Sequence, residues 1–234
     1  MILNDPPAIL WDDPHLIAVD KPAGLLTQGT PGGEPTLEDA VRRLVRPDDP
    51  GSVYLGTVHR LDRPVSGVVV WAKTPKAARR LAEAFARREM KKTYWAVVEG
   101  PPVAVETTWQ DAIGPVSPAG AATIDPVRGK PARTNVATLD GARVGPGLSA
   151  LVLRPETGRT HQIRVQTSSR GRPIVGDASY GATRPFPSGI ALHARGLIVT
   201  HPMSGRAISI VAPLPESWST SGFDFVEAVR VRRS

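Results

Sequence analysis

Short apolar runs separated by turn residues recur along the chain and predict many short β-strands. In the first 100 residues the runs rich in β-branched or aromatic side chains cover residues 8–11, 15–20, 52–57, 68–72 and 91–100. Later runs of the same kind cover residues 103–110, 133–139, 148–154, 191–200 and 207–211. Turn residues such as glycine and proline stand between most of these runs, so a sheet-rich fold is expected.

Two segments with helical periodicity interrupt the strands in the first half. The first is capped by Thr36, carries an acidic residue three positions later, and has an apolar stripe that ends near Val45. The second begins at Thr74 and Pro75, an N-cap followed by proline at the first helical position, and continues to about Glu89. Its arginines fall mainly opposite the apolar stripe, and a solvated helix face is a sufficient explanation for them.

Two further helices are predicted in the second half. Thr160 is placed to cap a short helix whose apolar side carries Ile163 and Val165, and a longer helix is expected over residues 215–229 with a break near Gly222. The sequence contains neither an internal repeat nor a low-complexity linker. We therefore predict one compact α+β domain with a bifurcated, mixed and mainly antiparallel sheet flanked by helices.

The amino-acid composition excludes several kinds of site and several classes of protein. The 234 residues contain no cysteine, which excludes disulfides, cysteine-based zinc sites and thiol catalysis. No apolar run approaches the roughly 20 residues that a membrane span needs, and the first residues lack the features of a signal peptide. A cytoplasmic protein with no membrane partner is predicted.

The charge balance points towards a polyanion. Lys and Arg number 29 against 22 Asp and Glu, which gives a net charge of +7 and a pI near 10.2. Nucleic acid is favoured over a membrane because no basic amphipathic helix with a large apolar face is present. Most of the cations are Arg, which pairs with phosphate through a planar fork. A genome that prefers arginine codons would produce the same bias.

The most distinctive polar stretch is residues 58–67, which join two predicted strands. Asp62 lies there with Arg60 two residues before it and Arg63 one residue after it. Nearby opposite charges favour the ionised form of a carboxylate, which suits a reactive group. A polar hairpin loop with a surface ion pair is the alternative.

Three other residues, in two segments, are candidates for a functional role from the sequence alone. Tyr94 shares one face of a predicted strand with Ala96 and Val98, where a half-buried structural tyrosine is equally consistent. His161 and Arg164 are three residues apart and share a helix face, although Arg164 could be an ordinary surface cation. No second histidine or carboxylate stands at ligand spacing from His161, so no metal site is predicted.

Three segments together resemble the RluA-type pseudouridine synthases. They are GTVHRLDRPVSG at residues 56–67, KTYWAVVEG at 92–100 and GRTHQIRV at 158–165, continued by GRPIVGDASYG at 171–181 and ALHA at 191–194. The resemblance runs in the family's order over about residues 17–213. It implies the pseudouridine-synthase fold, with a single catalytic domain over residues 1–234 and a core over about 15–213.

The resemblance also implies an activity and a catalytic set. Family members isomerise chosen uridines in ribosomal or transfer RNA, and Asp62 corresponds to the aspartate that is needed to break the glycosidic bond. Arg164 corresponds to the arginine that pairs with this aspartate. Tyr94 corresponds to the tyrosine that stacks on the flipped base and takes part in proton transfer. No cofactor or metal is expected, because an isomerisation changes no oxidation state and loses no group.

The implied partner is structured RNA, a stem-loop of 23S rRNA or tRNA, and a monomer is the expected state. A stacked uridine must be extruded at a cost of a few kcal/mol, and Arg60 corresponds to the arginine that fills the vacated space. His59 and Arg63 are expected to shape the loop or contact phosphate. Arg159 and His161 of the third motif are expected among the RNA contacts.

The sequence departs from the family pattern at two positions, with Val65 in place of the usual Thr and Gln166 in place of a common His. It also begins directly with catalytic-domain sequence, so the small N-terminal RNA-binding domain of some members is expected to be absent. Two alternatives remain: a catalytically silent RNA-binding protein on the same fold, and an unrelated phosphohydrolase with Asp62 as nucleophile. The second would need a metal and further carboxylates near Asp62, which this loop lacks.

Overall fold

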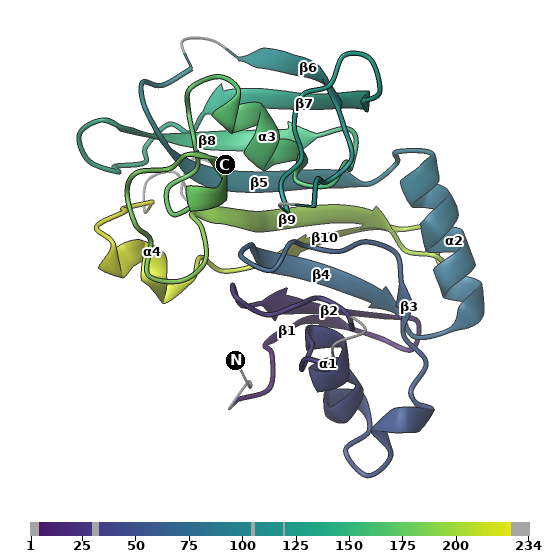
Figure 1. Ribbon diagram of the computed structural model, residues 1–234. Helices are drawn as coiled ribbons and strands as arrows, with labels where there is room; N and C mark the ends of the chain where they lie inside the picture. Colours follow the sequence, from purple (N-terminus) through teal and green to yellow (C-terminus); the bar gives the residue numbers. More distant parts are fainter. Residues whose placement is uncertain (1–4, 30–32, 104–105, 119, 226–234) are drawn as a thin grey trace. The chain divides into compact units, whose positions relative to one another are not determined.

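A computed structural model describes residues 5–29, 33–103, 106–118 and 120–225. The chain forms two compact units, one of residues 1–91 and 194–214 and the other of residues 92–193 and 215–234. Each unit combines antiparallel strand pairs with a few short helices (Figure 1), so the predicted α+β class is confirmed. The extent of a single domain over residues 1–234 stays a prediction.

The first unit is built on antiparallel strand pairs. Its strands are β1 (Ile9–Asp12), β2 (Leu16–Lys21), β3 (Gly56–Thr57), β4 (Ser66–Ala72), β10 (Ala207–Val211) and residues 194–200 of β9 (Leu192–Thr200). β2 pairs with β1 and β4, β3 pairs with the end of β4, and β10 pairs with β9. All seven residues of β4 are buried, which explains its continuous apolar sequence.

Two α-helices and a 3-10 turn complete this unit. They are α1 (Leu37–Val45), η1 (Pro50–Ser52) and α2 (Pro75–Ala86). The Thr36 cap is confirmed as a capping box, since its hydroxyl accepts from the Asp39 N–H at 3.1 Å and its N–H donates to the Asp39 carboxylate at 3.1 Å. The Thr74 hydroxyl accepts from Ala77 N–H at 3.2 Å, as expected for the second cap.

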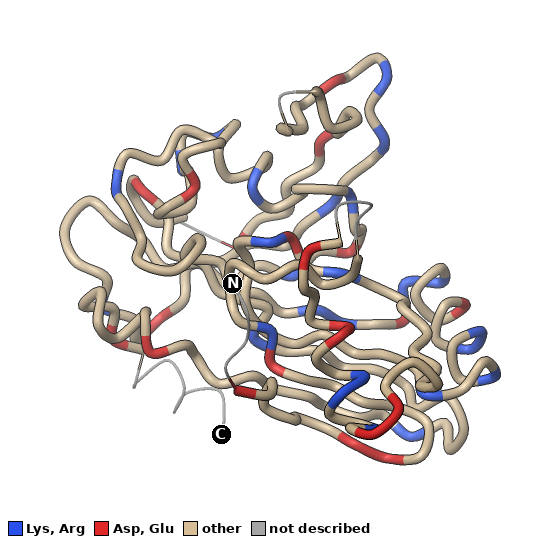
Figure 2. Tube along the Cα trace, turned by 60° about the horizontal axis from the view of Figure 1, so that its bottom comes forward, with Lys and Arg blue, Asp and Glu red and all other residues tan. Residues whose placement is uncertain are grey.

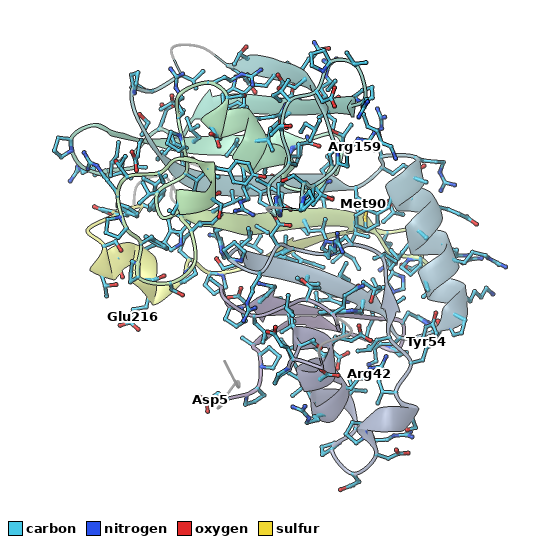
Figure 3. The ribbon with its side chains drawn as sticks, in the orientation of Figure 1. Asp5, Arg42, Tyr54, Met90, Arg159 and Glu216 are labelled. Carbon is cyan, nitrogen blue, oxygen red and sulfur yellow. The ribbon has the colours of Figure 1, made fainter. Side chains whose placement is uncertain are left out.

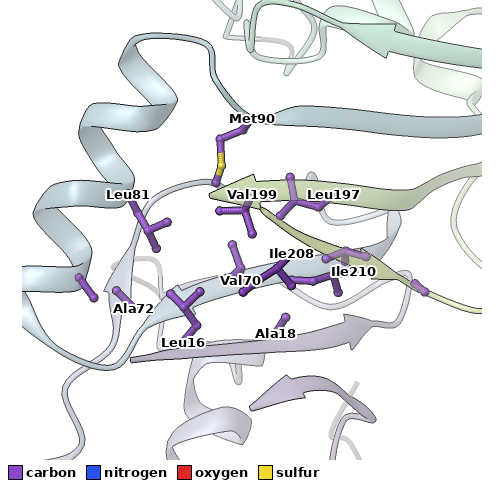
Figure 4. Packing of buried hydrophobic residues seen from close by; sticks show 13 residues of the cluster. Leu16, Ala18, Val70, Ala72, Leu81, Met90, Leu197, Val199, Ile208 and Ile210 are labelled. Atoms are coloured by element: carbon purple, nitrogen blue, oxygen red, sulfur yellow. The ribbon is translucent and has the colours of Figure 1, made fainter. Parts of the chain in front are cut away.

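The main core of the first unit lies between α2 and the strands (Figure 4). Leu81 of α2 packs with Leu16, Val70, Val199 and Ile210, all of them almost fully buried. The buried face of α2 consists of Ala77, Leu81 and Ala84, with Ala78 and Phe85 partly buried beside it. The predicted apolar stripe is therefore only partly right, because its member Ala82 is exposed.

Two predicted boundaries in this unit are wrong. Residues 52–57 do not form a strand throughout, because only Gly56 and Thr57 find partners on β4, and the segment before them begins as the 3-10 turn. Helix α2 ends at Ala86 rather than near Glu89, because Arg88 adopts a left-handed conformation with φ 60° that closes the helix.

The second unit contains a four-strand antiparallel arrangement in the order β5 (Lys91–Glu99), β8 (Leu148–Pro155), β7 (Lys130–Thr138) and β6 (Thr107–Ile113). Its helices are α3 (Gln162–Ser168), η2 (Ala178–Tyr180) and α4 (Glu216–Thr220). The strand predicted over residues 103–110 begins at Thr107, and residues 104–105 lie outside the described residues.

Two helix predictions in this unit need correction. Thr160 does not cap α3; His161 occupies the N-cap in a left-handed conformation with φ 57°. The C-terminal helix is short, because Gly222 turns the chain with φ 79° and Asp224 then forms a bridge with Arg143. Residues 226–229 of that predicted helix lie outside the described residues.

Candidate active site

Asp62 lies in the loop of residues 58–65, between β3 and β4, with its side chain half-buried. The neighbouring Leu61 is buried, and Thr27 anchors it twice: the Thr27 hydroxyl donates to Leu61 O at 2.8 Å and accepts from Leu61 N–H at 3.2 Å. A turn closes behind the aspartate, where Val65 N–H donates to Asp62 O at 3.0 Å. The backbone that carries the carboxylate is therefore fixed on both sides.

Lys21, the last residue of β2, holds the same loop through hydrogen bonds of its side chain. Its side chain is fully buried, and its ammonium donates to Pro22 O at 3.0 Å, Arg63 O at 3.1 Å and Val65 O at 2.7 Å. Burial lowers the pKa of Lys21 to about 7, while the nearby Asp62 carboxylate opposes this shift. Sequence reasoning missed this residue, although a lysine at the end of an apolar strand was a visible signal.

Asp20, next to this lysine, is a second buried ionisable group. Burial raises the pKa of Asp20 to about 6, and the cations Arg195 and Lys21 partly oppose that rise. Its Oδ1 is buried and has no hydrogen-bond partner among the described residues. The end of β2 therefore carries a carboxyl with a raised pKa next to an amine with a lowered pKa.

A glycine is required where the loop enters β4. Gly67 has φ 115°, a conformation that side chains rarely adopt, and a Cβ there would lie 2.3 Å from the carbonyl oxygen of Ala194 on β9. The glycine of the Ser-Gly pair after the HRLD sequence is thus required because any side chain at this position would clash with the backbone of β9.

The three other predicted residues of this loop behave differently from one another. His59 is structural: its Nε2 accepts from Val70 N–H at 3.0 Å and its ring stacks on Phe85 at 5.2 Å between centroids. Arg63 donates to Gly24 O at 3.1 Å and forms an exposed ion pair with Glu34 at 3.1 Å. Arg60 is exposed, and no partner for its side chain is found among the described residues.

Tyr94 and Lys92 belong to the second unit and lie on β5. Tyr94 is half-buried and stands opposite Leu153 of β8 in the antiparallel register. Lys92 donates to Thr157 O at 3.3 Å, and burial lowers the pKa of its ammonium. The Lys92 side chain thus links β5 by a hydrogen bond to the loop that leads into α3.

Arg164 is buried on α3 and oriented by a carboxylate. Its Nε and Nη2 donate to the two oxygens of Asp177 at 2.7 and 2.8 Å, and its guanidinium lies over the Tyr180 ring at 4.6 Å. Such a bidentate pair fixes the plane of the guanidinium. The alternative of an ordinary surface cation is therefore wrong. Asp177 belongs to the motif at residues 171–181, but its position in the sequence does not reveal that it is the partner of Arg164.

His161 and Arg159 lie at the start of α3, and Figure 3 labels Arg159. His161 Nδ1 is 2.8 Å from the Tyr180 hydroxyl, which in turn accepts from Ala122 N–H at 2.8 Å. Arg159 is half-buried and donates through Nε to Pro131 O at 3.0 Å. Both residues have structural contacts within the second unit, and their contacts with RNA stay predictions.

Two buried glutamines hold α3 against the strands of its unit. Gln162 accepts from the Thr157 hydroxyl at 2.7 Å and donates to the Thr134 hydroxyl at 2.9 Å. Gln166, which departs from the family's common histidine, accepts from Thr134 at 2.6 Å and donates to Asp111 at 2.7 Å. Gln166 therefore belongs to a buried hydrogen-bond network in which both ends of its amide have partners.

The catalytic set predicted from the sequence is divided between the two units, with Asp62 in the first and Tyr94 and Arg164 in the second. The pairing of Asp62 with Arg164 stays a prediction. Among the described residues, no group of three or more His, Asp or Glu could hold a metal ion. None of the described helices is long and apolar enough to cross a bilayer.

Sequence comparison identifies relatives over nearly the whole chain. The profile of the RNA pseudouridylate synthase family matches residues 15–169. An uncharacterized RNA pseudouridine synthase of Zymomonas mobilis is 36% identical, over 92% of this chain and 97% of that protein. The dual-specificity RNA pseudouridine synthase RluA of Escherichia coli is also 36% identical, over 88% of this chain and 92% of that protein. The ribosomal large subunit pseudouridine synthase D of Nitrosomonas europaea is 38% identical, and the chain covers 63% of it.

Two solved structures of RNA pseudouridylate synthase domains superpose on this chain. Human RNA pseudouridylate synthase domain containing 1 superposes with a TM-score of 0.73 at 28% identity, over 89% of this chain and 84% of that one. Human RNA pseudouridylate synthase domain containing 4 has the same TM-score at 23% identity, which supports the fold alone.

Proposed function

The chain belongs to the RNA pseudouridylate synthase family, and we propose that it isomerises specific uridines in ribosomal RNA, transfer RNA or both. Its relatives are named as RNA pseudouridine synthases, so the enzyme is an isomerase that acts on RNA. The observation that carries the proposal is the anchored Asp62 loop within a chain that matches this family.

Asp62 is the catalytic group in this proposal. The N1–C1′ bond of the uridine breaks, uracil turns, and C5 bonds to C1′; C5 loses a proton and N1 gains one, so no redox partner is needed. A fixed anion beside the sugar stabilises the positive charge that develops as the bond breaks. Attack on the base, attack on the sugar and assistance to sugar deprotonation are all compatible with this position. The Lys21 and Thr27 contacts support the proposal because they hold the loop rigidly.

Tyr94 and Arg164 complete the proposed catalytic set. Tyr94 stacks on the flipped uracil, and Arg164 pairs with Asp62. The geometry of Arg164 supports this role, because the bidentate pair with Asp177 fixes the plane of its guanidinium. A pre-oriented guanidinium loses little freedom when it binds a second carboxylate.

Arg60 is proposed to fill the space that the extruded uridine leaves in the RNA. Its exposure supports this role, since a guanidinium plane can stack on bases and pair with phosphate at once. Large-subunit ribosomal RNA is our first choice of target, and transfer RNA is the second. We expect the enzyme to act as a monomer in the cytoplasm.

Pseudouridine mapping of total RNA tests the proposal directly. Cells with and without the gene are compared, and the deletion strain is complemented with wild type or with Asp62→Ala. We expect one or more sites to be lost and to return with wild type only. Restoration of a site by Asp62→Ala would refute the role of Asp62. A different result would be that deletion changes no site and that the purified wild-type protein binds RNA from the deletion strain without modifying it. In that case the protein would be a catalytically silent RNA-binding protein rather than an enzyme.

A further inference from the structure

The segment of residues 74–91, which contains α2, holds much of the positive charge of the chain. It carries six Lys or Arg against two Glu, a net charge of +4 in a chain whose total is +7. All six cations are exposed. Figure 2 shows several basic positions along this helix and few acidic ones. The positive excess that pointed towards a polyanion is therefore concentrated in one short segment of the chain.

The cations of α2 share one face. Lys76, Arg79 and Arg80 follow one another at helical spacing, opposite the side on which Ala77 and Leu81 are buried. With about 3.6 residues per turn, these three cations fall within an arc of roughly 100°. From Lys76 to the end of the helix this face extends roughly 16 Å at about 1.5 Å per residue. Side chains of α2 that end in nitrogen project away from the strands of the first unit in Figure 3.

Helix stability does not explain this pattern. The positive end of the helix dipole lies at the N-terminus, where acidic side chains are favoured, yet Lys76 stands in the first turn of α2 and no acidic residue does. Helix α1 of the same unit shows the stabilising arrangement, with Glu38 and Asp39 in its first turn and Arg42 and Arg43 in its last.

Internal ion pairs do not explain it either. Both carboxylates of the segment, Glu83 and Glu89, are engaged by Arg87, at 3.9 and 2.6 Å. Arg80 donates to Pro202 O at 2.7 Å. The remaining four cations have no ion-pair partner among the described residues; they are Lys76, Arg79, Arg88 and Lys91.

Arg88 provides an independent observation. It ends α2 in a Schellman motif, in which Arg88 N–H donates to Phe85 O at 3.1 Å and Glu89 N–H donates to Ala84 O at 3.0 Å. The position has φ 60°, where glycine is preferred and an arginine is strained. A strained arginine at the end of a basic face indicates that its side chain is needed there.

We propose that the basic α2 segment, defined as Lys76 and Arg79 on α2 with Arg88 and Lys91 after its end, binds the phosphate backbone of an RNA helix outside the target nucleotide. Lys and Arg pair strongly with phosphate, and the shape of an A-form helix is read through such backbone contacts. The proposal rests on the proposed function only in taking RNA as the substrate. It adds a second contact surface, carried by α2 and the residues that follow it.

Binding of a fluorescein-labelled RNA duplex of about 16 base pairs tests the proposal. Anisotropy titrations between about 50 and 200 mM salt compare wild type with the triple variant Lys76→Gln, Arg79→Gln and Arg88→Gln. The matched control removes three exposed cations from other elements, Arg43→Gln, Arg128→Gln and Arg206→Gln. We expect about tenfold weaker binding by the first variant and a salt slope shallower by two to three, with a much smaller change in the control.

Equal losses in the two triple variants, or no loss in the α2 variant, would overturn the proposal, as would absence of duplex binding by wild type. Arg88→Gly separates effects on folding from effects on binding. Because glycine relieves the strained conformation, this variant should have a higher melting temperature and yet bind the duplex a few-fold more weakly. Unchanged binding by this variant would contradict the proposal. Pseudouridine formation by wild type is measured separately. Failure of catalysis with intact α2-dependent binding would contradict the proposed function alone.

Discussion

The buried ion pair between Arg164 and Asp177 offers the sharpest test of how the second unit holds the arginine that we propose as a partner of Asp62. The exposed fractions of the two side chains are 7% and 2%, and both oxygens of the carboxylate are used. Asp177→Asn keeps the shape of the side chain but removes the negative charge to which Nε and Nη2 of the buried guanidinium donate. Removing one partner of such a pair costs about 3–5 kcal/mol.

The expected loss is large enough for ordinary unfolding experiments. For a protein of this size each kcal/mol shifts the melting temperature by roughly 2–4 °C, so Asp177→Asn should melt roughly 6–20 °C below wild type. Urea titration followed by tryptophan fluorescence gives the free energy of unfolding independently. The matched control is Glu34→Gln, which breaks the pair with Arg63 whose side chains are each 51% exposed; that change should cost less than about 1 kcal/mol.

A double variant separates stability from chemistry. Arg164→Met with Asp177→Leu replaces the pair by apolar side chains and should regain most of the lost stability. It should remain inactive, because the arginine proposed to pair with Asp62 is gone. If Asp177→Asn were as stable as Glu34→Gln, the pair would not hold α3 as the distances suggest. An active double variant would refute the role of Arg164.

Three other predictions concern the first unit. Because Asp20 has its pKa raised from 3.8 to about 6, the folded protein holds this proton more tightly than the unfolded chain does, and stability should fall as pH rises through that window. Asp20→Asn should remove this fall, and urea titrations at several pH values that gave parallel curves for the two proteins would contradict the assignment. Thr27→Val keeps the size of the side chain but removes both hydrogen bonds to Leu61, so it should destabilise by about 2 kcal/mol and reduce turnover; unchanged melting and activity would disprove the anchor. Arg60→Ala should change stability by less than about 0.5 kcal/mol, yet lower turnover more on a structured RNA than on a loose single strand, and equal losses on both would argue against base flipping.

Local chemistry allowed much of the fold to be predicted from the sequence. The caps at Thr36 and Thr74 are confirmed, because capping depends on residues only three positions apart. Strand β10 has the predicted bounds, and β2, β4, β5 and β8 differ from theirs by one or two residues. The segments that failed depend on distant partners: residues 52–55 lack a neighbouring strand, and the chain after Gly222 turns to meet Arg143.

In the candidate site too, some features follow from local sequence and others depend on distant partners. The HRLD sequence predicts Asp62 as a catalytic residue, and the family motifs predict Tyr94 and Arg164, because motif residues are close together in the sequence; these roles stay predictions. Only the tertiary structure revealed that the ammonium of Lys21 holds the Asp62 loop from a strand more than forty residues away. Only the fold could assign Asp177 to Arg164, since a buried charge is stabilised by whichever counter-charge packing brings to it, and the order of residues does not fix that choice.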